Sequence, residues 1–385
     1  MSLAPGSGIR VLHILHNLRG GGAQRRVAEL VAFARQHGED WMIAYLSEPS
    51  SQLMPYLERN GIPVVGPLSG SFRSPRNVTK LLQLVNELKP DLLNAHTTWP
   101  GFWAAKLHGR FSGPIVYTEH SVSSSPGFVG RVKFWIHAKL TFHGVDWIVC
   151  VSEALARAVR RVAPAVAHKT SVVYNGLDTR SLQVTKSRRE VRRELSVADD
   201  QPLICAVGHI VQIKRYEVPI RAMASVCRDF PTAVLLIAGE VRDKALFQRL
   251  QGLAVQMGVQ DNVAFLGMRH DVPDLLSAAD VFVMSSHLEG LPGALVEAAF
   301  IGCPVVASAV WGIPEIIEAE QSGILVPPGD PEAFASGIKR LLSDPDLARR
   351  LAQRAQEDVR RRFTMEAMYE GYRQLYERLC STHSP

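Results

Sequence analysis

The chain has 385 residues, with 46% hydrophobic and 21% charged residues, which excludes a wholly disordered or low-complexity protein. This length exceeds what one hydrophobic core usually supports, so two domains are expected. No run approaches the roughly 18 apolar residues of a membrane span, and the N-terminus lacks the features of a signal peptide. A cytoplasmic location is therefore expected.

The distribution of charge and cysteine narrows the choice of partners. Residues 1–177 contain 19 Lys and Arg against 10 Asp and Glu, whereas the remainder contains 24 against 27. The basic first part indicates an anionic ligand or an anionic membrane surface, unless it is only a solvated basic surface. No nucleic-acid motif accompanies the charge, so nucleic acid is not expected as a partner. The five scattered cysteines form neither a disulfide framework nor a zinc motif.

Short β-branched runs alternate with amphipathic stretches along the whole chain. The spacing of Val27, Leu30, Val31 and Ala34 predicts a helix over 23–36, between the first two strands. Two long helices are predicted at the end of the chain, over 346–362 and 365–379. Strands are predicted at 9–15, 41–46, 91–95, 114–118, 147–151, 171–174, 202–207, 233–238, 263–266, 281–284, 305–307 and 324–326. This alternation predicts parallel sheets with helices on both faces.

The alternation pauses once, in a polar and charge-dense segment at 177–201. We therefore expect a doubly wound α/β domain over 1–176, a linker over 177–201 and a second such domain over 202–362. The last helix, 363–385, is expected to pack back on the first domain. Ligands of this architecture bind outside the carboxyl ends of the strands, so a cleft between the two domains is the expected site.

In the first domain, two features follow predicted strands. The turn containing Gly21 and Gly22 leads from the first strand into a helix, where backbone N–H groups can hold an anion. It lacks the spacing of a dinucleotide fingerprint, and a tight turn without a ligand would also explain it. His96 and His120 stand at the ends of adjacent strands. Such histidines are often structural, but two together favour a site.

In the second domain, candidates follow the strands at 202–207 and 281–284. Lys214 is placed to act as a phosphate counter-ion, although a solvated lysine is the common alternative. The stretch HLEGLPGALVE puts Glu289 in a loop and Glu297 in a helix that begins near Pro292. Backbone N–H groups at Gly290 and Leu291 would offer an anion site between the two carboxylates. That layout suits a nucleotide sugar. No metal motif stands out.

These residues together resemble the retaining family-4 glycosyltransferases, which have the GT-B fold of two Rossmann-like parallel-sheet domains facing across a cleft. The interval from Glu289 to Glu297 matches the E-x7-E motif of that family. Further blocks that match the family lie, in order, at 173–178, 279–281, 302–308, 312–315 and 323–330.

The resemblance implies that the second domain binds the donor, a nucleotide diphosphate sugar, and that the first is the acceptor-side domain. Glu297 would accept hydrogen bonds from the ribose, Glu289 would face the sugar hydroxyls, and Lys214 would neutralise the leaving diphosphate. His120 would lie near the reacting carbon, which makes His120, Lys214 and Glu289 the catalytic candidates. Other donor-binding candidates are Gly21, Gly22, His209, Gly267, Met268, Arg269, Gly290 and Leu291. Acceptor-side candidates are Arg19, His96 and Trp99, and neither metal nor cofactor is implied.

Two positions depart from the family pattern. His209 stands where an arginine is usual, and a mostly neutral imidazole cannot replace a bidentate guanidinium. Either Arg215 or Arg242 compensates, or the leaving group is stabilised less strongly. Trp311 stands where glycine is common, which would narrow the sugar pocket.

The expected function is retaining, metal-independent transfer of a sugar, with a UDP-sugar favoured as the donor. The acceptor would be lipid-linked or a polysaccharide or other glycan of the cell envelope, reached at the inner face of a membrane. A sugar-nucleotide epimerase, a phosphorylase and a catalytically silent nucleotide-sugar-binding protein remain alternatives. Aromatic and basic residues of the first domain indicate peripheral membrane contact, but the helical spacing of Phe128, Val132, Trp135 and Ile136 favours a core stripe.

Overall fold

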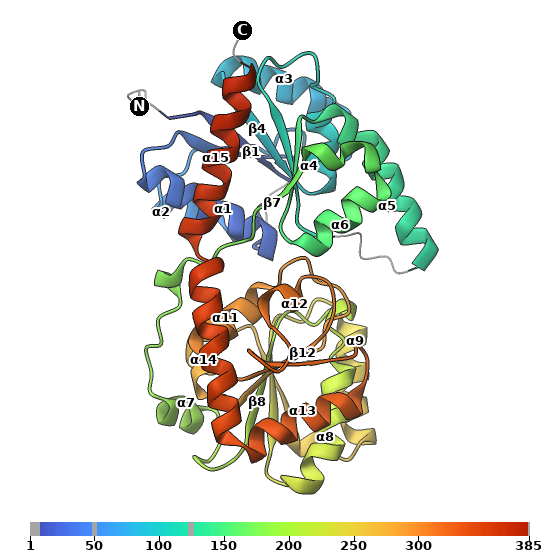
Figure 1. The fold of residues 1–385 in the computed structure, drawn as a ribbon, viewed down its shortest axis with the longest axis vertical. Coiled ribbons are helices and arrows are strands. Elements are labelled where there is room, and N and C mark those ends of the chain that lie inside the picture. The colour runs from blue at the N-terminus through green and yellow to red at the C-terminus, as the bar shows by residue number, and fades with distance from the viewer. Residues whose placement is uncertain (1–7, 48–51, 122–126, 384–385) are drawn as a thin grey trace. The chain divides into compact units, whose positions relative to one another are not determined.

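The computed structural model describes residues 8–47, 52–121 and 127–383 (Figure 1). The chain divides into two compact units. Unit 1 comprises Met1–Gly176 together with Phe363–Pro385, and unit 2 comprises Leu177–Arg362. Each unit contains one parallel sheet with helices on both faces, as the alternation of strands and helices predicts.

The sheet of unit 1 has the strand order β3-β2-β1-β4-β5-β6-β7. Its central strands are buried on both faces, which explains why they read as continuous apolar runs. The strands are β1 (Val11–Leu15), β2 (Trp41–Tyr45), β3 (Val64–Val65), β4 (Leu92–His96), β5 (Ile115–Glu119), β6 (Trp147–Cys150) and β7 (Thr170–Val172). All the predicted strands of this half are present, and the two-residue β3 was missed because it is too short to show a pattern.

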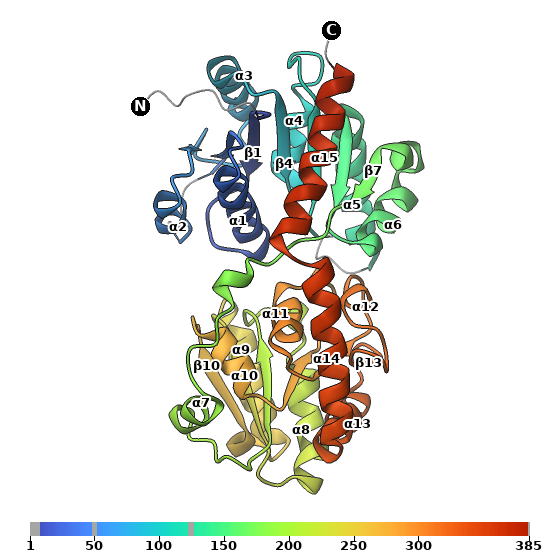
Figure 2. The ribbon, with the colours of Figure 1, turned by 60° about the vertical axis from the view of Figure 1, so that its left-hand side comes forward.

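The helices of unit 1 cover the two faces of this sheet. The helix α1 packs against α15 on one face, while α3, α4, α5 and α6 contact one another in sequence on the other (Figures 1 and 2). Their bounds are α1 (Gly22–Gln36), α2 (Met54–Arg59), α3 (Arg76–Leu88), α4 (Thr98–Ala105), α5 (Gly127–Thr141), α6 (Glu153–Val162) and α15 (Met365–His383).

The last helix, α15, is part of the core of unit 1. Its side chains Met368, Tyr372 and Tyr376 are fully buried in the cluster that contains β1 and α1. The Tyr376 hydroxyl accepts a hydrogen bond of 2.6 Å from the amide of Asn94 in β4. Because a buried amide needs such a partner, this bond fixes where the helix lies on the sheet.

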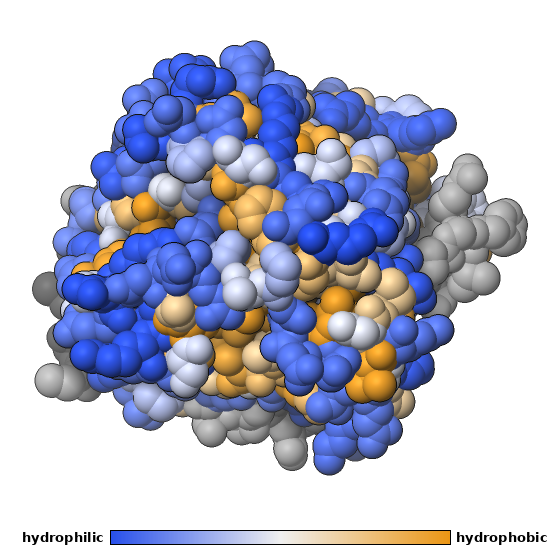
Figure 3. Space-filling view, turned by 90° about the horizontal axis from the view of Figure 1, so that it is seen from below, coloured by the Kyte–Doolittle hydropathy of each residue, from blue (hydrophilic) through white to orange (hydrophobic). Residues whose placement is uncertain are grey.

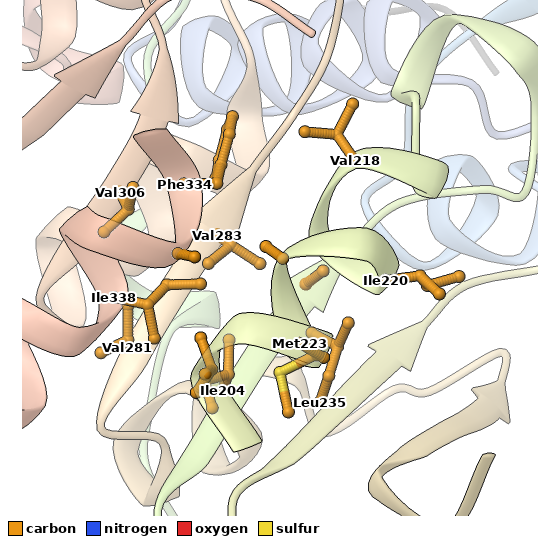
Figure 4. Packing of buried hydrophobic residues seen from close by; sticks show 14 of the residues in the cluster. Ile204, Val218, Ile220, Met223, Leu235, Val281, Val283, Val306, Phe334 and Ile338 are labelled. Atoms are coloured by element: carbon orange, nitrogen blue, oxygen red, sulfur yellow. The ribbon is translucent and has the colours of Figure 1, made fainter. Parts of the chain in front are cut away.

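Unit 2 contains a sheet of order β10-β9-β8-β11-β12-β13. The helix α8 packs against α13 over one face of this sheet, and Figure 4 shows Met223 of α8 and Phe334 of α13 among the strand residues there. The strands are β8 (Leu203–Val207), β9 (Val234–Ala238), β10 (Val263–Gly267), β11 (Val281–Met284), β12 (Val305–Ser308) and β13 (Ile324–Val326). The helices are α7 (Arg188–Glu194), α8 (Glu217–Asp229), α9 (Lys244–Gln256), α10 (Val272–Ala278), α11 (Gly293–Ile301), α12 (Ile313–Ile316), α13 (Pro331–Ser343) and α14 (Pro345–Arg362).

Both sheets reverse their winding direction at one pair of strands. The reversal lies between β1 and β4 in unit 1 and between β8 and β11 in unit 2. In doubly wound sheets the loops that leave such a pair diverge to opposite faces and open a crevice at the carboxyl edge. The loops after these four strands are therefore where ligand-binding residues are expected.

The segment 177–201, predicted as a linker, is folded onto unit 2. It contains α7, whose Arg192 is buried against the loop before β8. The Arg192 guanidinium donates to the carbonyls of Ala198, Gln201 and Ala278 and to the Asp280 carboxylate at 2.7 Å. The linker interpretation was wrong here because polar composition also fits a helix anchored through hydrogen bonds instead of apolar contacts.

The expected core stripe on α5 was also wrong. Val132, Trp135 and Ile136 are 37%, 46% and 45% exposed, and the side chain of Phe128 lies outside the described part of the chain. The buried face of α5 is instead formed by Phe134, His137, Ala138 and Thr141. That set also follows a helical spacing, so the sequence of α5 contained two candidate buried faces. In the structure, the less apolar of these two faces is the buried one.

No helix in the described part of the chain combines the length and the apolarity that a bilayer crossing requires. Figure 3 shows one face of the molecule, on which hydrophilic residues surround separate apolar patches.

Replacing Arg192 by Ala should destabilise the protein, because it leaves buried carbonyls and Asp280 without their donor. We expect a loss of about 3 kcal/mol in the free energy of unfolding. Urea unfolding of the full chain, followed by circular dichroism, measures this loss. The control is Arg189→Ala on the same helix, whose ion pair with Asp199 is exposed, and it should change stability by less than about 0.5 kcal/mol. Equal losses in both variants would contradict the anchoring role.

Candidate functional site

An ion pair joins the two loops that leave β8 and β11 in unit 2. The Lys214 ammonium donates to Glu289 Oε1 at 2.6 Å, and the two side chains are 18% and 16% exposed. Both residues were predicted from the sequence as site residues, Lys214 for phosphate and Glu289 for sugar hydroxyls. The structure brings them together, so an arriving anionic ligand would meet a cation already held in place by a carboxylate.

The same two loops are also joined through their backbones. The Ser285 hydroxyl donates to the carbonyl of Lys214 at 2.8 Å, and the amide of His287 donates to the carbonyl of Ile213 at 2.9 Å. Beneath them, the Tyr216 hydroxyl donates to the carbonyl of Gly208 at 2.7 Å. These bonds fix the backbone that carries Lys214, so its ammonium is positioned more narrowly than that of an ordinary surface lysine.

The helix α11 begins at Gly293, four residues after Glu289, with Pro292 at the N-cap. No side chain caps this helix end. Within the described residues, the backbone N–H groups of Gly290, Leu291 and Gly293 donate to no protein acceptor. Free N–H groups at the positive end of a helix dipole form an anion site. The turn that was predicted to bind phosphate therefore has backbone donors without a protein acceptor among the described residues.

Glu297 lies in the second turn of α11 and is half-buried. On the other side of Glu289, the amide of Gly312 donates to the Glu289 carbonyl at 3.3 Å. Trp311, which precedes that glycine, has a φ of +47°, a backbone conformation that favours glycine. The loop after β12 is thus held against the Glu289 loop with a strained tryptophan beside it.

His209 follows β8 and lies near an acidic side chain. Its Nδ1 is 3.7 Å from Glu240 Oε2, and Glu240 also accepts from Arg242 at 2.8 Å. Burial, and then the positive charge of Arg242, lower the pKa of His209, so the imidazole is neutral at pH 7. Arg242 is therefore engaged by Glu240, and Arg215 forms an ion pair with Glu217. Both arginines that could compensate for His209 already have a carboxylate partner.

Three donor-binding candidates, which the family resemblance places next to the nucleotide base, lie at the end of β10. Gly267 is its last residue, and its carbonyl accepts from the amide of Gly239 at 2.7 Å. Met268 is 53% exposed, and Arg269 donates to the Asp271 carboxylate at 2.8 Å. These residues offer exposed backbone and an apolar side chain, two strands away from β8 in the sheet order.

In unit 1, the glycine turn leads into α1 as predicted. Gly21 is the N-cap of this helix, and no side chain caps it. A side chain added at Gly22 would meet no neighbouring atom within 4 Å, whereas one added at Gly21 would lie 2.6 Å from Gln24 Oε1, so the turn is open at Gly22. Arg19 is exposed, and its amide donates to the side chain of Asn17. The turn therefore has room for a ligand to approach its backbone.

His96 and His120 are hydrogen bonded to each other in unit 1. His96 Nδ1 is 3.0 Å from His120 Nε2, and His96 Nε2 is 2.9 Å from Nδ1 of His13 in β1. Burial lowers the pKa of His120 to about 4 and that of His13 to about 3, so these rings are neutral. His96 is fully buried, so it has no exposed atom with which to contact an acceptor.

Trp99, the third acceptor-side candidate, lies in the first turn of α4 and is half-buried. Its ring lies 5.6 Å from that of Phe72 and 5.8 Å from the guanidinium carbon of Arg73. Trp99, three residues after His96, thus forms an aromatic and cationic cluster with Phe72 and Arg73.

Three residues of these sites were missed in the sequence. Glu240 is the second residue after the end of β9, and a carboxylate near the carboxyl end of a strand was the available signal. His13 is a polar residue inside an apolar strand, which also could have been noticed. Ser285 gave no signal, because its role is to bind a backbone carbonyl 71 residues away.

Among the described residues, no group of His, Cys, Asp and Glu is arranged to hold a metal ion.

Two family models match the chain. The model described as Glycosyltransferase Family 4 matches residues 20–181, and the one described as Glycosyl transferases group 1 matches residues 187–358.

Individual relatives agree with these matches. The uncharacterized glycosyltransferase MJ1607 of Methanocaldococcus jannaschii is 30% identical over 297 residues, which cover 74% of this chain and 75% of that protein. The lipopolysaccharide core biosynthesis glycosyltransferase LpsE of Rhizobium meliloti is 30% identical over 299 residues, covering 77% and 78%. The crystal structure of HepE from Anabaena in complex with UDP superposes with a TM-score of 0.84 at 24% identity, over 97% of this chain and all of that one. The chain therefore belongs to the glycosyltransferases of the GT-B fold.

Proposed function

We propose that this protein is a retaining glycosyltransferase that takes a sugar from a UDP-sugar and transfers it to a lipid-linked or polysaccharide acceptor. The observation that carries the proposal is the Lys214–Glu289 ion pair beside the uncapped N-terminus of α11. The Lys214 ammonium and the free backbone donors would bind the diphosphate and its leaving oxygen. The Glu289 carboxylate would accept a hydrogen bond from a sugar hydroxyl.

The choice of a uridine nucleotide is supported by a structural relative. HepE from Anabaena has been crystallised with UDP and with UDP-glucose. The lipid-linked or glycan acceptor is supported by LpsE, which is named for lipopolysaccharide core biosynthesis.

The ion pair explains how the donor could be received. In the free protein Glu289 holds the Lys214 ammonium, which has three N–H donors and can bind more than one oxygen. A diphosphate at the α11 N-terminus would share Lys214, and one Glu289 oxygen would become available to a sugar hydroxyl. Glu297, further along α11, would accept from the ribose hydroxyls.

Departure of the diphosphate develops negative charge on the leaving oxygen. Lys214 and the backbone N–H groups of Gly290 and Leu291 would stabilise that charge without reorganising, because they are already fixed. In a retaining reaction the acceptor attacks from the face that the diphosphate leaves, so the leaving phosphate can itself take the acceptor proton. His120 would act at the transfer step. The proposed reaction uses neither a metal ion nor a cofactor.

A membrane surface is the proposed location of the acceptor. Four of the large apolar residues exposed in the described chain lie on α5, namely Val132, Trp135, Ile136 and Leu140. The Lys139 ammonium lies 4.2 Å from the centre of the Trp135 ring. An exposed apolar face that carries a cation suits the interface of an anionic bilayer.

A catalytically silent nucleotide-sugar-binding protein is the alternative that a specific residue favours, because His209 is neutral where the family has arginine. Slow hydrolysis of the donor in the absence of acceptor would exclude this alternative.

Glu297→Ala should weaken donor binding, because a charged acceptor for ribose hydroxyls is lost. We expect about 100-fold weaker binding of the cognate UDP-sugar, which corresponds to about 2.8 kcal/mol. Thermal shift with a panel of nucleotide sugars, followed by calorimetry with the best one, measures it. The matched control is Glu357→Ala on the exposed face of α14, which should bind as the unmodified protein does. Intact binding by Glu297→Ala would remove the ribose assignment.

His209→Arg should increase the transfer rate, because it adds a guanidinium near Lys214 and Glu240. We expect kcat/KM to rise about threefold to tenfold, or by about 0.7–1.4 kcal/mol in activation free energy. Gln256→Arg, which adds the same charge on the exposed part of α9, controls for net charge. A rate that does not rise would mean that His209 is adequate for this leaving group.

The double variant Trp135→Gln, Leu140→Gln should bind anionic vesicles at least about tenfold more weakly, because apolar area that would enter the interface is removed. Sedimentation with vesicles containing phosphatidylglycerol, against vesicles of phosphatidylcholine alone, measures this. Val255→Gln removes an apolar residue that is 65% exposed in unit 2 and should not change binding. Binding that does not depend on anionic lipid would contradict the membrane proposal.

A further inference from the structure

Three histidines of unit 1 form a continuous hydrogen-bonded row across adjacent strands. His13 belongs to β1, His96 ends β4, and His120 directly follows β5. Each contact joins Nδ1 of one ring to Nε2 of the next, at 2.9 Å and 3.0 Å. The His13 and His96 rings are nearly parallel, with planes 13° apart.

Among the described residues, neither end of this row has a hydrogen-bond partner. His13 Nε2 and His120 Nδ1 are buried and have no hydrogen-bond partner within the described residues. Buried polar atoms are rarely left in this way, and exceptions call for an explanation. The unpartnered nitrogen at the His120 end lies on the residue that the family resemblance assigns to the transfer step.

The geometry restricts the protons of all three rings together. A neutral imidazole carries one N–H, so each shared contact needs one donor and one acceptor nitrogen. If His120 carries its proton on Nδ1, its Nε2 must accept from His96 Nδ1, and His96 Nε2 must then accept from His13 Nδ1. The opposite arrangement puts every proton on Nε2. The three rings therefore share one tautomer, and a change in one requires a change in all.

Burial supports this reading because it keeps the rings neutral. Desolvation lowers the pKa values of all three, and the neighbouring rings disfavour charge on His96 further. The Glu119 carboxyl accepts from the backbone N–H of His120, and burial raises the pKa of this carboxyl to about 7. Trp41 and Tyr376 pack against the His13 ring, and Asn94 is bonded to Tyr376 and Thr118.

We propose that His13 and His96 are positioning residues that fix the ring orientation and the tautomer of His120, and so decide whether its buried, unpartnered Nδ1 is a hydrogen-bond donor or an acceptor at the transfer step. The assignment of the substrate contact rests on the proposed transferase function. The coupling among the rings does not, and it can be measured without any activity.

Nitrogen-15 NMR of the full chain labelled in histidine tests the coupling directly. Lone-pair and protonated ring nitrogens have distinct shifts, so the tautomer of each ring can be read. We expect one tautomer at His13, His96 and His120, and a changed His120 signal in His13→Phe. Mixed tautomers in the unmodified protein, or an unchanged His120 signal in His13→Phe, would overturn the proposal even if transfer activity is confirmed.

The control for this experiment is Tyr376→Phe. Its ring also packs on His13, but the hydroxyl that it loses bonds to Asn94, outside the row. Tyr376→Phe should leave the His120 signal as it was. A change equal to that of His13→Phe would mean that the signal reports general packing, and the proposal would fall.

A double-mutant cycle tests the functional half. His13→Phe should lower kcat about threefold to tenfold while leaving KM for the donor unchanged, and should have no further effect in a His120→Ala background. His96→Asn, which keeps an amide near His120 Nε2, should retain more activity than His96→Phe. Equal losses from His13→Phe in both backgrounds would show a merely structural role. If no variant or unmodified protein transfers sugar, the proposed function fails while the NMR result still decides the coupling.

Discussion

The pairing of β8 with β11 is the constraint on which the chemistry of unit 2 depends. These strands are neighbours only because the sheet reverses its winding between them, with β9 added on one side and β12 on the other. Their carboxyl ends release two loops side by side, and hydrogen bonds from Ser285 and His287 join those loops before any ligand is present. The ion pair of Lys214 with Glu289 is the result. An ammonium and a carboxylate are thereby held next to the uncapped N-terminus of α11, and the proposed phosphate site consists of these groups.

Unit 1 uses the corresponding reversal between β1 and β4 for a different purpose. Here neutral, buried histidines lie within β1 and at the end of β4, whereas the loops of unit 2 carry a part-buried ion pair. Burial that would be costly for a charge is acceptable for an imidazole, which can donate at one nitrogen and accept at the other. Beneath the row, α15 adds Tyr376 and Tyr372 to the same face of the sheet, so a helix from the end of the chain completes the surroundings of residues near its beginning.

Much of this architecture was readable from the sequence. The strands follow from local periodicity, and among the described strands only the two-residue β3 was missed. The position of Glu289 in a loop and Glu297 in a helix follows from Pro292 and the glycines around it. The errors share one cause. The polar segment 177–201 fitted either a linker or a helix anchored by hydrogen bonds, and α5 had two candidate buried faces. In both cases contacts with residues distant in the chain determined the structure.

The sequence by itself determined the alternation of elements, the two sheets and the candidate residues at strand ends, because these depend on residues within a few positions of one another. Only the tertiary structure decided which candidates meet. Lys214 finds Glu289 across 75 residues, and His13 finds His96 across 83. It also decided that Arg242 and Arg215 already have carboxylate partners and that the Trp135 face of α5 is exposed. Such pairings depend on strand order and helix packing, which local periodicity does not specify.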